Sequence, residues 1–317
     1  MSDMTYRRIG RSGLTVSEIG LGSWLTYGAG VDDRTSIACI RTALDAGVLF
    51  FDTADVYAGG EAERVLGRAL SGIRRADLVI ATKAYFPMSD NPNDRGLSRK
   101  HLHESLNASL TRLGTDYVDL FQCHRPDPTV PIAETVRAMD DLVRAGKTLY
   151  WGVSMWSAEQ MAEAHRIAEA THAAPPISNQ PPYSLVDRAI EASVLPWCRE
   201  HGVGQVVFSP LAEGLLTGKY RADATPAGSR AAHEQRGRFL RPMLTPENFA
   251  RVERLAKIAD EAGLPLARLA LAWVLRDPGV ASAIVGASHP EQVQENVKAA
   301  GVKLDASTLD AIERALV

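Results

Sequence analysis

Short apolar runs recur along the chain, and each is followed by a stretch in which apolar positions return at helical spacing. Eight such runs are expected to form strands, at residues 18–22, 48–53, 78–83, 117–124, 148–154, 177–180, 205–210 and 282–287. Most are apolar without strict alternation, which is typical of parallel strands buried on both faces. Successive runs mostly start about thirty residues apart, which leaves room for a helix that crosses back over the sheet.

The segments between these runs carry helix boundary signals. Ser98 precedes a stripe of leucines at helical spacing that stops at Gly114, and Ser157 with Gln160 forms a capping box. No flexible linker divides the chain, and no GxGxxG motif supports a Rossmann site. Eight strand–helix units without an internal boundary predict an α/β fold, a single (β/α)8 barrel, rather than two doubly wound domains.

Two regions fall outside the repeat, and the chain is expected to end in one more helix. Residues 5–17 are expected to form a hairpin before the first barrel strand. A loop at 211–246 and two helical patterns, 247–262 and 265–276, precede the eighth strand, and residues 305–316 form one more helix. A loop this long inside a compact domain is usually functional or disordered.

Composition narrows the class of protein. The 317 residues are 45% hydrophobic and 23% charged, with a net charge of -3, so we expect one folded domain over 1–317 and no nucleic-acid partner. The chain start has no apolar run like the core of a signal peptide, and no membrane span is expected. Three cysteines without a CxxC pair indicate reduced thiols and a cytoplasmic protein.

Polar residues stand at the ends of three consecutive predicted strands. Asp52 ends the second strand, with Tyr57 five residues later. Lys83 ends the third strand and His124 the fourth. In such a barrel the chemistry lies at the C-terminal ends of the strands, so these side chains are expected to meet at one rim. Asp52 and Lys83 lie on adjacent strands and can neutralise each other when buried.

This set of side chains suits proton donation at neutral pH. A free tyrosine, with a pKa of about 10, is a poor acid. A cation within ~4–6 Å favours the phenolate, so Lys83 is expected to lower the pKa of Tyr57. His124 is expected to orient a carbonyl oxygen beside the Tyr57 hydroxyl. A general acid tuned in this way is typically worth ~10²–10⁴ in rate.

At these residues the sequence resembles the aldo-keto reductases, whose catalytic tetrad is Asp, Tyr, Lys and His. Asp52, Tyr57, Lys83 and His124 match it in order, within FDTADVY, ATK and CH. The resemblance covers nearly the whole chain and is strongest to the branch of the potassium-channel beta-subunits and bacterial relatives. Its motifs are GLGSW (20–24), RPDP (125–128), YWGVSMWS (150–157), SPLAEGLLTGKY (209–220) and GASHPEQVQENV (286–297). It implies NADPH-dependent reduction of an aldehyde or ketone, with Tyr57 giving the proton.

The resemblance also implies cofactor contacts. The matching positions are Ser23, Trp24, Asp52, Ser154, Gln180, Phe208, Ser209, Pro210, Leu211, Ala212, Lys219, Arg230, Gly286, Ser288, Gln292, Glu295 and Asn296. Ser154 and Gln180 match positions that hold the nicotinamide carboxamide, and Phe208 matches the aromatic residue stacked on the ring. Lys219 and Arg230 match positions near the adenosine 2′-phosphate.

The sequence departs from the family pattern near the phosphate. Gly286 and Gln292 stand where another branch has Lys and Arg on the 2′-phosphate, so a preference for NADPH must rest on Lys219 and Arg230. A charge-assisted hydrogen bond contributes ~1.5–3 kcal/mol, about tenfold or more in affinity. Two such contacts would suffice to select NADPH over NADH.

Two other functions stay open. The chain can be a nucleotide-binding regulatory subunit with little turnover, like the channel beta-subunits, although these lack a histidine at the position of His124. It can also be a metal-dependent barrel hydrolase. His101 and His103 form an HxH pattern, but on a helix two such residues do not share a face, so no metal is expected.

The substrate is expected to be a small carbonyl compound. Trp24, Tyr85 and Trp156 are candidates to line the substrate mouth, with plain wall packing as the alternative for the last two. Length and charge leave the oligomeric state open, a homo-oligomer included.

Overall fold

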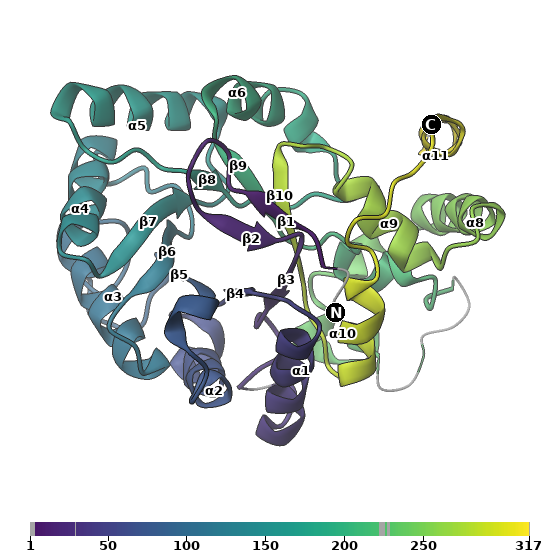
Figure 1. The fold of residues 1–317 in the computed structure, drawn as a ribbon, viewed down its shortest axis with the longest axis horizontal. Helices are drawn as coiled ribbons and strands as arrows, with labels where there is room; N and C mark the ends of the chain where they lie inside the picture. The colour runs from purple at the N-terminus through teal and green to yellow at the C-terminus, as the bar shows by residue number, and fades with distance from the viewer. Residues whose placement is uncertain (1–3, 29, 222–225, 227–228, 317) are drawn as a thin grey trace.

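Eight parallel strands close into a barrel in the computed structural model, which describes residues 4–28, 30–221, 226 and 229–316 (Figure 1). The strands are β3 (Ile19–Gly22), β4 (Phe50–Asp52), β5 (Val79–Ala84), β6 (Val118–Cys123), β7 (Thr148–Val153), β8 (Ser178–Asn179), β9 (Gly204–Val207) and β10 (Val280–Val285). They follow one another around the barrel in chain order, and β10 pairs with β3 to close it. The predicted (β/α)8 fold is therefore confirmed.

Helices connect successive strands and form the outer layer. Those between β3 and β9 are α1 (Asp33–Asp45), α2 (Glu61–Leu70), α3 (Arg99–Leu113), α4 (Ile132–Arg144), α5 (Ala158–Thr171) and α6 (Val194–His201). Ser98 caps α3 by accepting a hydrogen bond from the amide of His101, and Gly114 ends it with a left-handed φ of 69°. Ser157 and Gln160 form the predicted capping box of α5.

The extra segments lie where the sequence predicts them. Before β10 the chain forms η4 (Ala212–Thr217), η5 (Arg230–Ala232), α7 (Glu234–Gly237), η6 (Arg241–Met243), α8 (Pro246–Glu261) and α9 (Leu266–Val274), and after it α10 (Pro290–Val297) and α11 (Ala306–Leu316). The predicted 211–246 loop is thus largely made of short helical turns, and residues 222–225 and 227–228 of it lie outside the described part. The Arg254 guanidinium donates to the carbonyl of Ala315 at 2.8 Å and ties α8 to α11.

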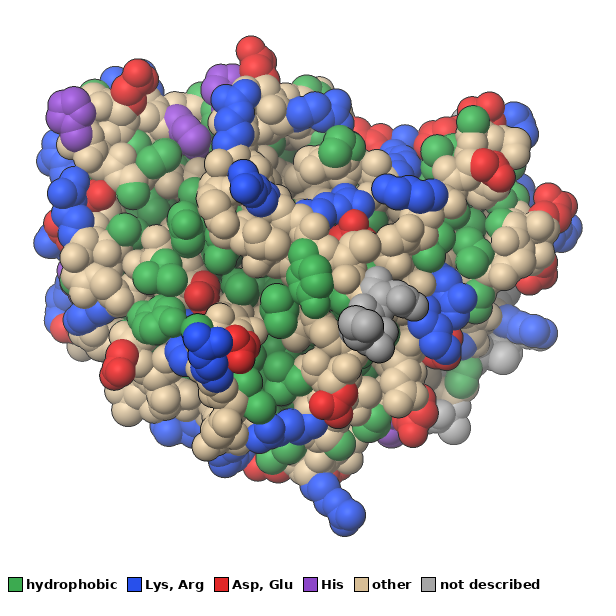
Figure 2. All heavy atoms as spheres, viewed as in Figure 1, with side chains coloured by type: hydrophobic (Ala, Val, Ile, Leu, Met, Phe, Trp, Pro, Cys, Tyr) green, Lys and Arg blue, Asp and Glu red, His purple; other side chains and the backbone are tan. Residues whose placement is uncertain are grey.

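The N-terminal hairpin covers the end of the barrel where the strands begin. β1 (Tyr6–Arg8) and β2 (Thr15–Ser17) pair antiparallel. The amide of Arg11 donates to the carbonyl of Gly202 just before β9, and a side chain at Gly10 would overlap that carbonyl oxygen. Figure 2 views this face, where positive, negative and apolar side chains are interspersed.

Apolar side chains fill the barrel below the rim. Phe50, Leu120, Val206 and Ile284 pack with Ile9 of the hairpin, and a larger apolar cluster lies between the strands and the helices. This packing leaves the opposite end of the barrel, where the strands finish, as the place for polar side chains. Among the described residues, no helix is long and apolar enough to cross a membrane.

Candidate active site

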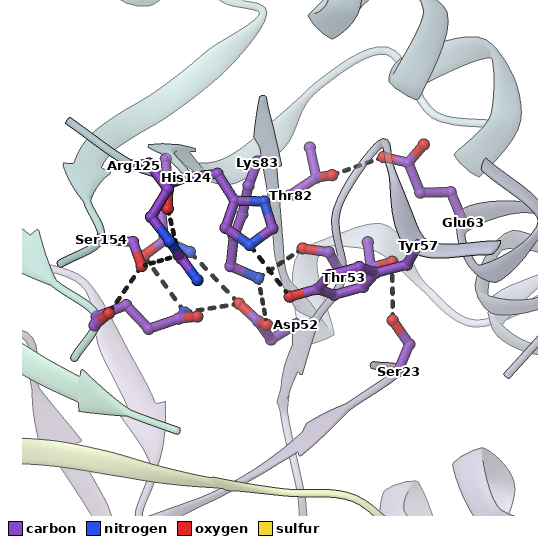
Figure 3. A network of polar contacts seen from close by, with 12 residues as sticks. Ser23, Asp52, Thr53, Tyr57, Glu63, Thr82, Lys83, His124, Arg125 and Ser154 are labelled. Carbon is purple, nitrogen blue, oxygen red and sulfur yellow. Dashed lines mark hydrogen bonds and ion pairs between the residues drawn. The ribbon is translucent and has the colours of Figure 1, made fainter. Parts of the chain in front are cut away.

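A buried ion pair joins the ends of β4 and β5. Lys83 Nζ lies 2.5 Å from Asp52 Oδ1 and donates to the carbonyl of Thr53 at 2.7 Å (Figure 3). The Lys83 side chain is completely buried, so burial lowers its pKa while the Asp52 carboxylate opposes this. The second oxygen of Asp52 accepts hydrogen bonds from the side-chain amides of Gln180 (2.9 Å) and Gln122 (3.3 Å). Both charges are therefore satisfied inside the protein.

Tyr57 lies at the start of the turn η1 (Tyr57–Gly60), just after β4. Its hydroxyl is 3.4 Å from Nε2 of His124, and Lys83 Nζ lies 5.2 Å from the centre of its ring. The two rings meet edge to face, with centroids 5.5 Å apart. Beyond Tyr57 the backbone is left-handed at Ala58, with a φ of 51°. The four tetrad residues predicted from sequence are therefore brought together at one rim.

The protonation of this site differs from the prediction in one respect. Burial, and then the Asp52 carboxylate, raise the pKa of Tyr57 well above its usual value of 10, and Arg125 opposes them. The expected lowering by Lys83 is not found, because burial and the Asp52 carboxylate outweigh the positive charges near the ring. The phenol is thus fully protonated at neutral pH, as a proton donor must be.

His124 is neutral in this environment. Burial, together with the positive charges of Lys83 and Arg125, lowers the pKa of His124 well below its usual 6.5. Its Nδ1 is buried and has no hydrogen-bond partner among the described residues. The other nitrogen, Nε2, faces the Tyr57 hydroxyl, so the imidazole contributes a hydrogen-bonding group without a charge.

Asp55 is a buried carboxyl group that holds the segment before Tyr57 in place. The Asp55 carboxyl accepts hydrogen bonds from Ser105 Oγ (2.7 Å) and the amide of Val56 (2.6 Å), and the Asp55 amide donates to the Lys83 carbonyl. Burial raises the pKa of Asp55 to about 7, opposed by the Ser105 hydrogen bond. These contacts hold the segment that leads into Tyr57 between β5 and α3.

Glu63 of α2 is a second buried carboxylate. It accepts hydrogen bonds from Thr82 Oγ1 and from Arg112 Nε, each at 2.6 Å, as Figure 3 shows for Thr82. Thr82 lies on β5 next to Lys83, and Arg112 lies on α3. The carboxylate therefore fixes α2, which begins just after Tyr57, against both neighbouring elements.

Three of the predicted cofactor-binding residues lie against this cluster. Ser154 Oγ donates to the carbonyl of Gln180 at 2.8 Å, and the Gln180 side chain reaches Asp52. Ser23 Oγ donates to Thr53 Oγ1 at 2.9 Å. The ends of β3, β7 and β8 therefore bring these side chains to the same rim as the tetrad.

The chain leaves β9 through a strained loop that contains Phe208, Ser209, Pro210, Leu211 and Ala212. Backbone φ is positive at Ser209 (50°) and Ala212 (47°). Within the described part of the chain, the backbone amides of Ser209 and Leu211 donate no hydrogen bond. Free amides on a loop with such alternating conformations are a common way to bind phosphate oxygens.

The two predicted phosphate-binding cations differ in their surroundings. Arg230 forms an ion pair with Glu213, which also accepts a hydrogen bond from Ser209 Oγ. Lys219 is exposed, and no carboxylate of the described residues lies within 4.0 Å of it. Arg230 is therefore linked through Glu213 to the loop that contains Ser209, whereas the Lys219 ammonium faces solvent.

The predicted adenosine-side residues gather around α10. Ser288 donates to the side-chain oxygen of Gln292 through its amide (2.8 Å), and Glu295 forms an ion pair with Arg268 of α9 (3.2 Å). Asn296 is buried, and Gly286 follows β10 directly. Arg268 was not predicted, since nothing in its own sequence neighbourhood connects it with α10.

The candidate mouth residues separate into two groups. Trp24 packs on Phe239 of the long β9–β10 connection, with ring centroids 4.9 Å apart, and Tyr85 packs on Phe86, which contacts His124. Trp156 is only 3% exposed. This burial favours the wall-packing alternative for Trp156.

Some site residues were not predicted. Gln122 and Arg125 contact Asp52 and Ser154, respectively, and Thr53 accepts a hydrogen bond from Lys83. Gln122 stands two residues before His124, which directly follows β6, so the alternation of side chains already puts both on the inner side of the barrel. The contact of Arg125 with Ser154 depends on the conformation of a long side chain, which the spacing of residues in the sequence does not determine.

The remaining histidine pattern lies away from the rim cluster. His101 and His103 fall in the first turns of α3, and the nearest carboxylate to His101 is Asp94, at 3.5 Å. Over the described residues, no group of three or more His, Cys, Asp or Glu side chains is arranged to hold a metal ion.

Comparison with known proteins assigns the chain to a family. The model described as the aldo/keto reductase family matches residues 18–317. Two similar relatives, from Arabidopsis thaliana and Oryza sativa subsp. japonica, are both named "Probable voltage-gated potassium channel subunit beta". Each is 44% identical, over 99% and 98% of this chain and 97% and 96% of the respective relative. The chain therefore belongs to the aldo/keto reductase family.

Proposed function

We propose that this protein is an NADPH-dependent reductase of aldehydes or ketones in which Tyr57 is the general acid. Membership of the aldo/keto reductase family supports a general oxidoreductase role. The observation that carries the proposal is the position of the Tyr57 hydroxyl, 3.4 Å from His124 Nε2 above the buried Lys83–Asp52 pair. When bound, the dinucleotide supplies the hydride that the carbonyl carbon receives.

The protein's own part is to orient the carbonyl and deliver a proton. His124, neutral and beside the phenol, positions the carbonyl oxygen next to the Tyr57 hydroxyl. Tyr57 then donates its proton to that oxygen, and negative charge develops on the phenol oxygen. Lys83 and Arg125 are cations near the ring, so they stabilise this charge more strongly in the transition state than in the resting phenol. The raised pKa makes the resting Tyr57 a weak acid, so the proton transfer depends on this stabilisation of the charge on its oxygen.

The residues of the rim fit a dinucleotide. Ser154 and Gln180 would hold the carboxamide next to Asp52, and Phe208 would face the nicotinamide ring. The unpaired amides of Ser209 and Leu211 offer donors to the pyrophosphate. Lys219, which is exposed and unpaired among described residues, would bind the 2′-phosphate, and Arg230 would act through Glu213 by shaping the loop.

Replacement of Tyr57 by phenylalanine tests the proposal. Tyr57→Phe should bind NADPH with the affinity of the wild type and lose ~10²–10⁴ in kcat, because only the proton donor is removed. Tyr117→Phe is a matched control, since Tyr117 lies just before β6, at the opposite end of the strands. Retention of turnover in Tyr57→Phe would refute the role of Tyr57.

A second function is supported by the names of the relatives. Two relatives of 44% identity are named as probable potassium-channel beta-subunits, so this chain can serve as a nucleotide-binding regulatory subunit with little turnover. Tight NADPH binding without NADPH oxidation over a broad panel of aldehydes would favour that function over the reductase.

We also propose a single cytoplasmic domain over 1–317. Cys39, Cys123 and Cys198 are all buried free thiols, as in a reducing compartment. Burial raises the pKa of Cys39 to about 11, so this thiol is unreactive at neutral pH.

A further inference from the structure

Arg125 is a partly buried cation in the candidate active site that lacks a carboxylate partner. One of its terminal nitrogens, Nη1, donates to the carbonyl of His124 at 2.5 Å and lies 3.5 Å from Ser154 Oγ. Its guanidinium carbon is 5.5 Å from the centre of the Phe86 ring. Figure 3 shows the guanidinium between Ser154 and His124, on the side of the rim that Tyr57 faces. Over the described residues, no carboxylate oxygen lies within 4.0 Å of it.

Arg41 donates to the carbonyl of Ser71, but most other partly buried arginines among the described residues are paired with carboxylates. Their ion pairs are Arg7–Glu18, Arg75–Asp119, Arg112–Glu63, Arg188–Glu191, Arg268–Glu295 and Arg276–Glu191. Burying an unpaired charge is costly, and proteins normally compensate it. The nearby carboxylate of Asp52 is already engaged by Lys83, Gln180 and Gln122, so it does not compensate Arg125.

The charge of Arg125 acts on the reacting groups themselves. It opposes the rise in the pKa of Tyr57 and contributes to the lowered pKa of His124, as expected for a cation close to both rings. Because the guanidinium lies beside the His124 carbonyl and Ser154, an anion bound by it would be close to a carbonyl held by Tyr57 and His124. A planar guanidinium with free donors matches a carboxylate in shape as well as charge.

We propose that Arg125 is a specificity-determining residue that binds the carboxylate of a short oxo-carboxylic acid, whose aldehyde or ketone group is the one reduced. The inference rests on the proposed reductase function and names its substrate class. It predicts that a substrate with a carboxylate a few atoms from the carbonyl is used better than its neutral ester. No further cofactor or chemistry is needed, because the carboxylate only binds.

A matched pair of substrates tests this assignment. The ratio of kcat/KM for a four-carbon ω-oxo acid to that for its methyl ester should fall about 10- to 100-fold in Arg125→Gln, the range of one charge-assisted ion pair. Arg125→Lys should retain part of the ratio, since the charge remains without the planar fork. Arg74→Gln, at a 78% exposed side chain, is the control and should keep the wild-type ratio. If Arg125 acted only on Tyr57, acid and ester would lose activity equally, and an unchanged ratio would overturn the assignment.

A binding measurement separates this inference from the proposed function. Butyrate and butyramide are titrated by calorimetry into the wild-type protein and Arg125→Gln, each saturated with NADPH. Butyrate should bind the wild type at least tenfold more tightly than butyramide, and the substitution should remove the difference. Equal binding of the two by the wild type would overturn the inference without any need for a folded variant. Arg125-dependent binding of butyrate without turnover of either aldehyde would support the anion site and reject the reductase.

Discussion

The carboxyl group of Asp55 accepts a hydrogen bond of 2.7 Å from the hydroxyl of Ser105 on α3. This contact anchors the segment that carries Tyr57 to the helical layer. It also buries a carboxyl group completely, with Glu63 as a second carboxylate nearby and Arg112 as the cation that partly compensates them. The stability of this anchor must therefore depend on pH.

We expect the free energy of unfolding to fall as the pH rises from about 4 to about 7. The pKa of Asp55 in the folded protein is raised from 3.8 to about 7, so the native state holds a proton that the unfolded chain has already lost. The stabilisation is complete below about pH 4 and is lost as the pH approaches 7. Urea unfolding of the wild type and Asp55→Asn at pH 4.5, 6 and 7.5 measures it. The difference between the two proteins should change across this range; a constant difference would contradict the assignment.

The Asp52–Lys83 pair should behave as one unit. Lys83→Met leaves a buried carboxylate without its cation, so it should cost about 3–5 kcal/mol of unfolding free energy. Asp52→Asn combined with Lys83→Met should recover much of this loss, because no charge is then buried alone. Turnover should stay lost in both variants. Additive losses in a double-mutant cycle of urea unfolding would argue against direct coupling.

Lys219 should contribute to the choice of cofactor. Lys219→Ala is expected to weaken NADPH binding about tenfold and to leave NADH binding unchanged, since only NADPH carries the 2′-phosphate. Lys257→Ala, at an exposed position of α8, is the control. Fluorescence titration of both cofactors measures the affinities, and an unchanged NADPH/NADH ratio would remove Lys219 from the phosphate site.

Turnover should not follow the titration of a normal histidine. The pKa of His124 lies well below 6.5, so the imidazole stays neutral as the pH falls through that value. kcat/KM for a neutral aldehyde is therefore expected to stay flat from pH 8 down to about 6. A loss of activity with a midpoint at pH 6.5 that disappears in His124→Asn would show that His124 is protonated there.

The barrel was predictable because its strands are buried on both faces and stand out as apolar runs. The ends of these strands were less predictable. The run at 205–210 forms a strand only to Val207, since the backbone turns left-handed at Ser209. At 177–180 only Ser178 and Asn179 are paired.

The tetrad could be predicted because each member stands at or near a strand end, so the barrel itself brings the members together. Contacts made by long side chains could not be predicted from the sequence. Arg230 pairs with Glu213, seventeen residues away, across a loop whose path no periodicity describes. The sequence likewise does not show that Arg125 lacks a carboxylate partner among the described residues, because this depends on which residues surround it in the fold.

The hairpin that covers one end of the barrel has a kinetic consequence under the proposed function. Because β1 and β2 cover that end and apolar side chains fill the barrel, cofactor and carbonyl compound would both reach the tetrad from the rim where the strands end. A carbonyl compound that arrived first would obstruct the nicotinamide, whereas a dinucleotide already in place leaves the Tyr57 side accessible. Under the proposed function we therefore expect the coenzyme to bind before the carbonyl compound, and the alcohol to leave before the oxidised coenzyme.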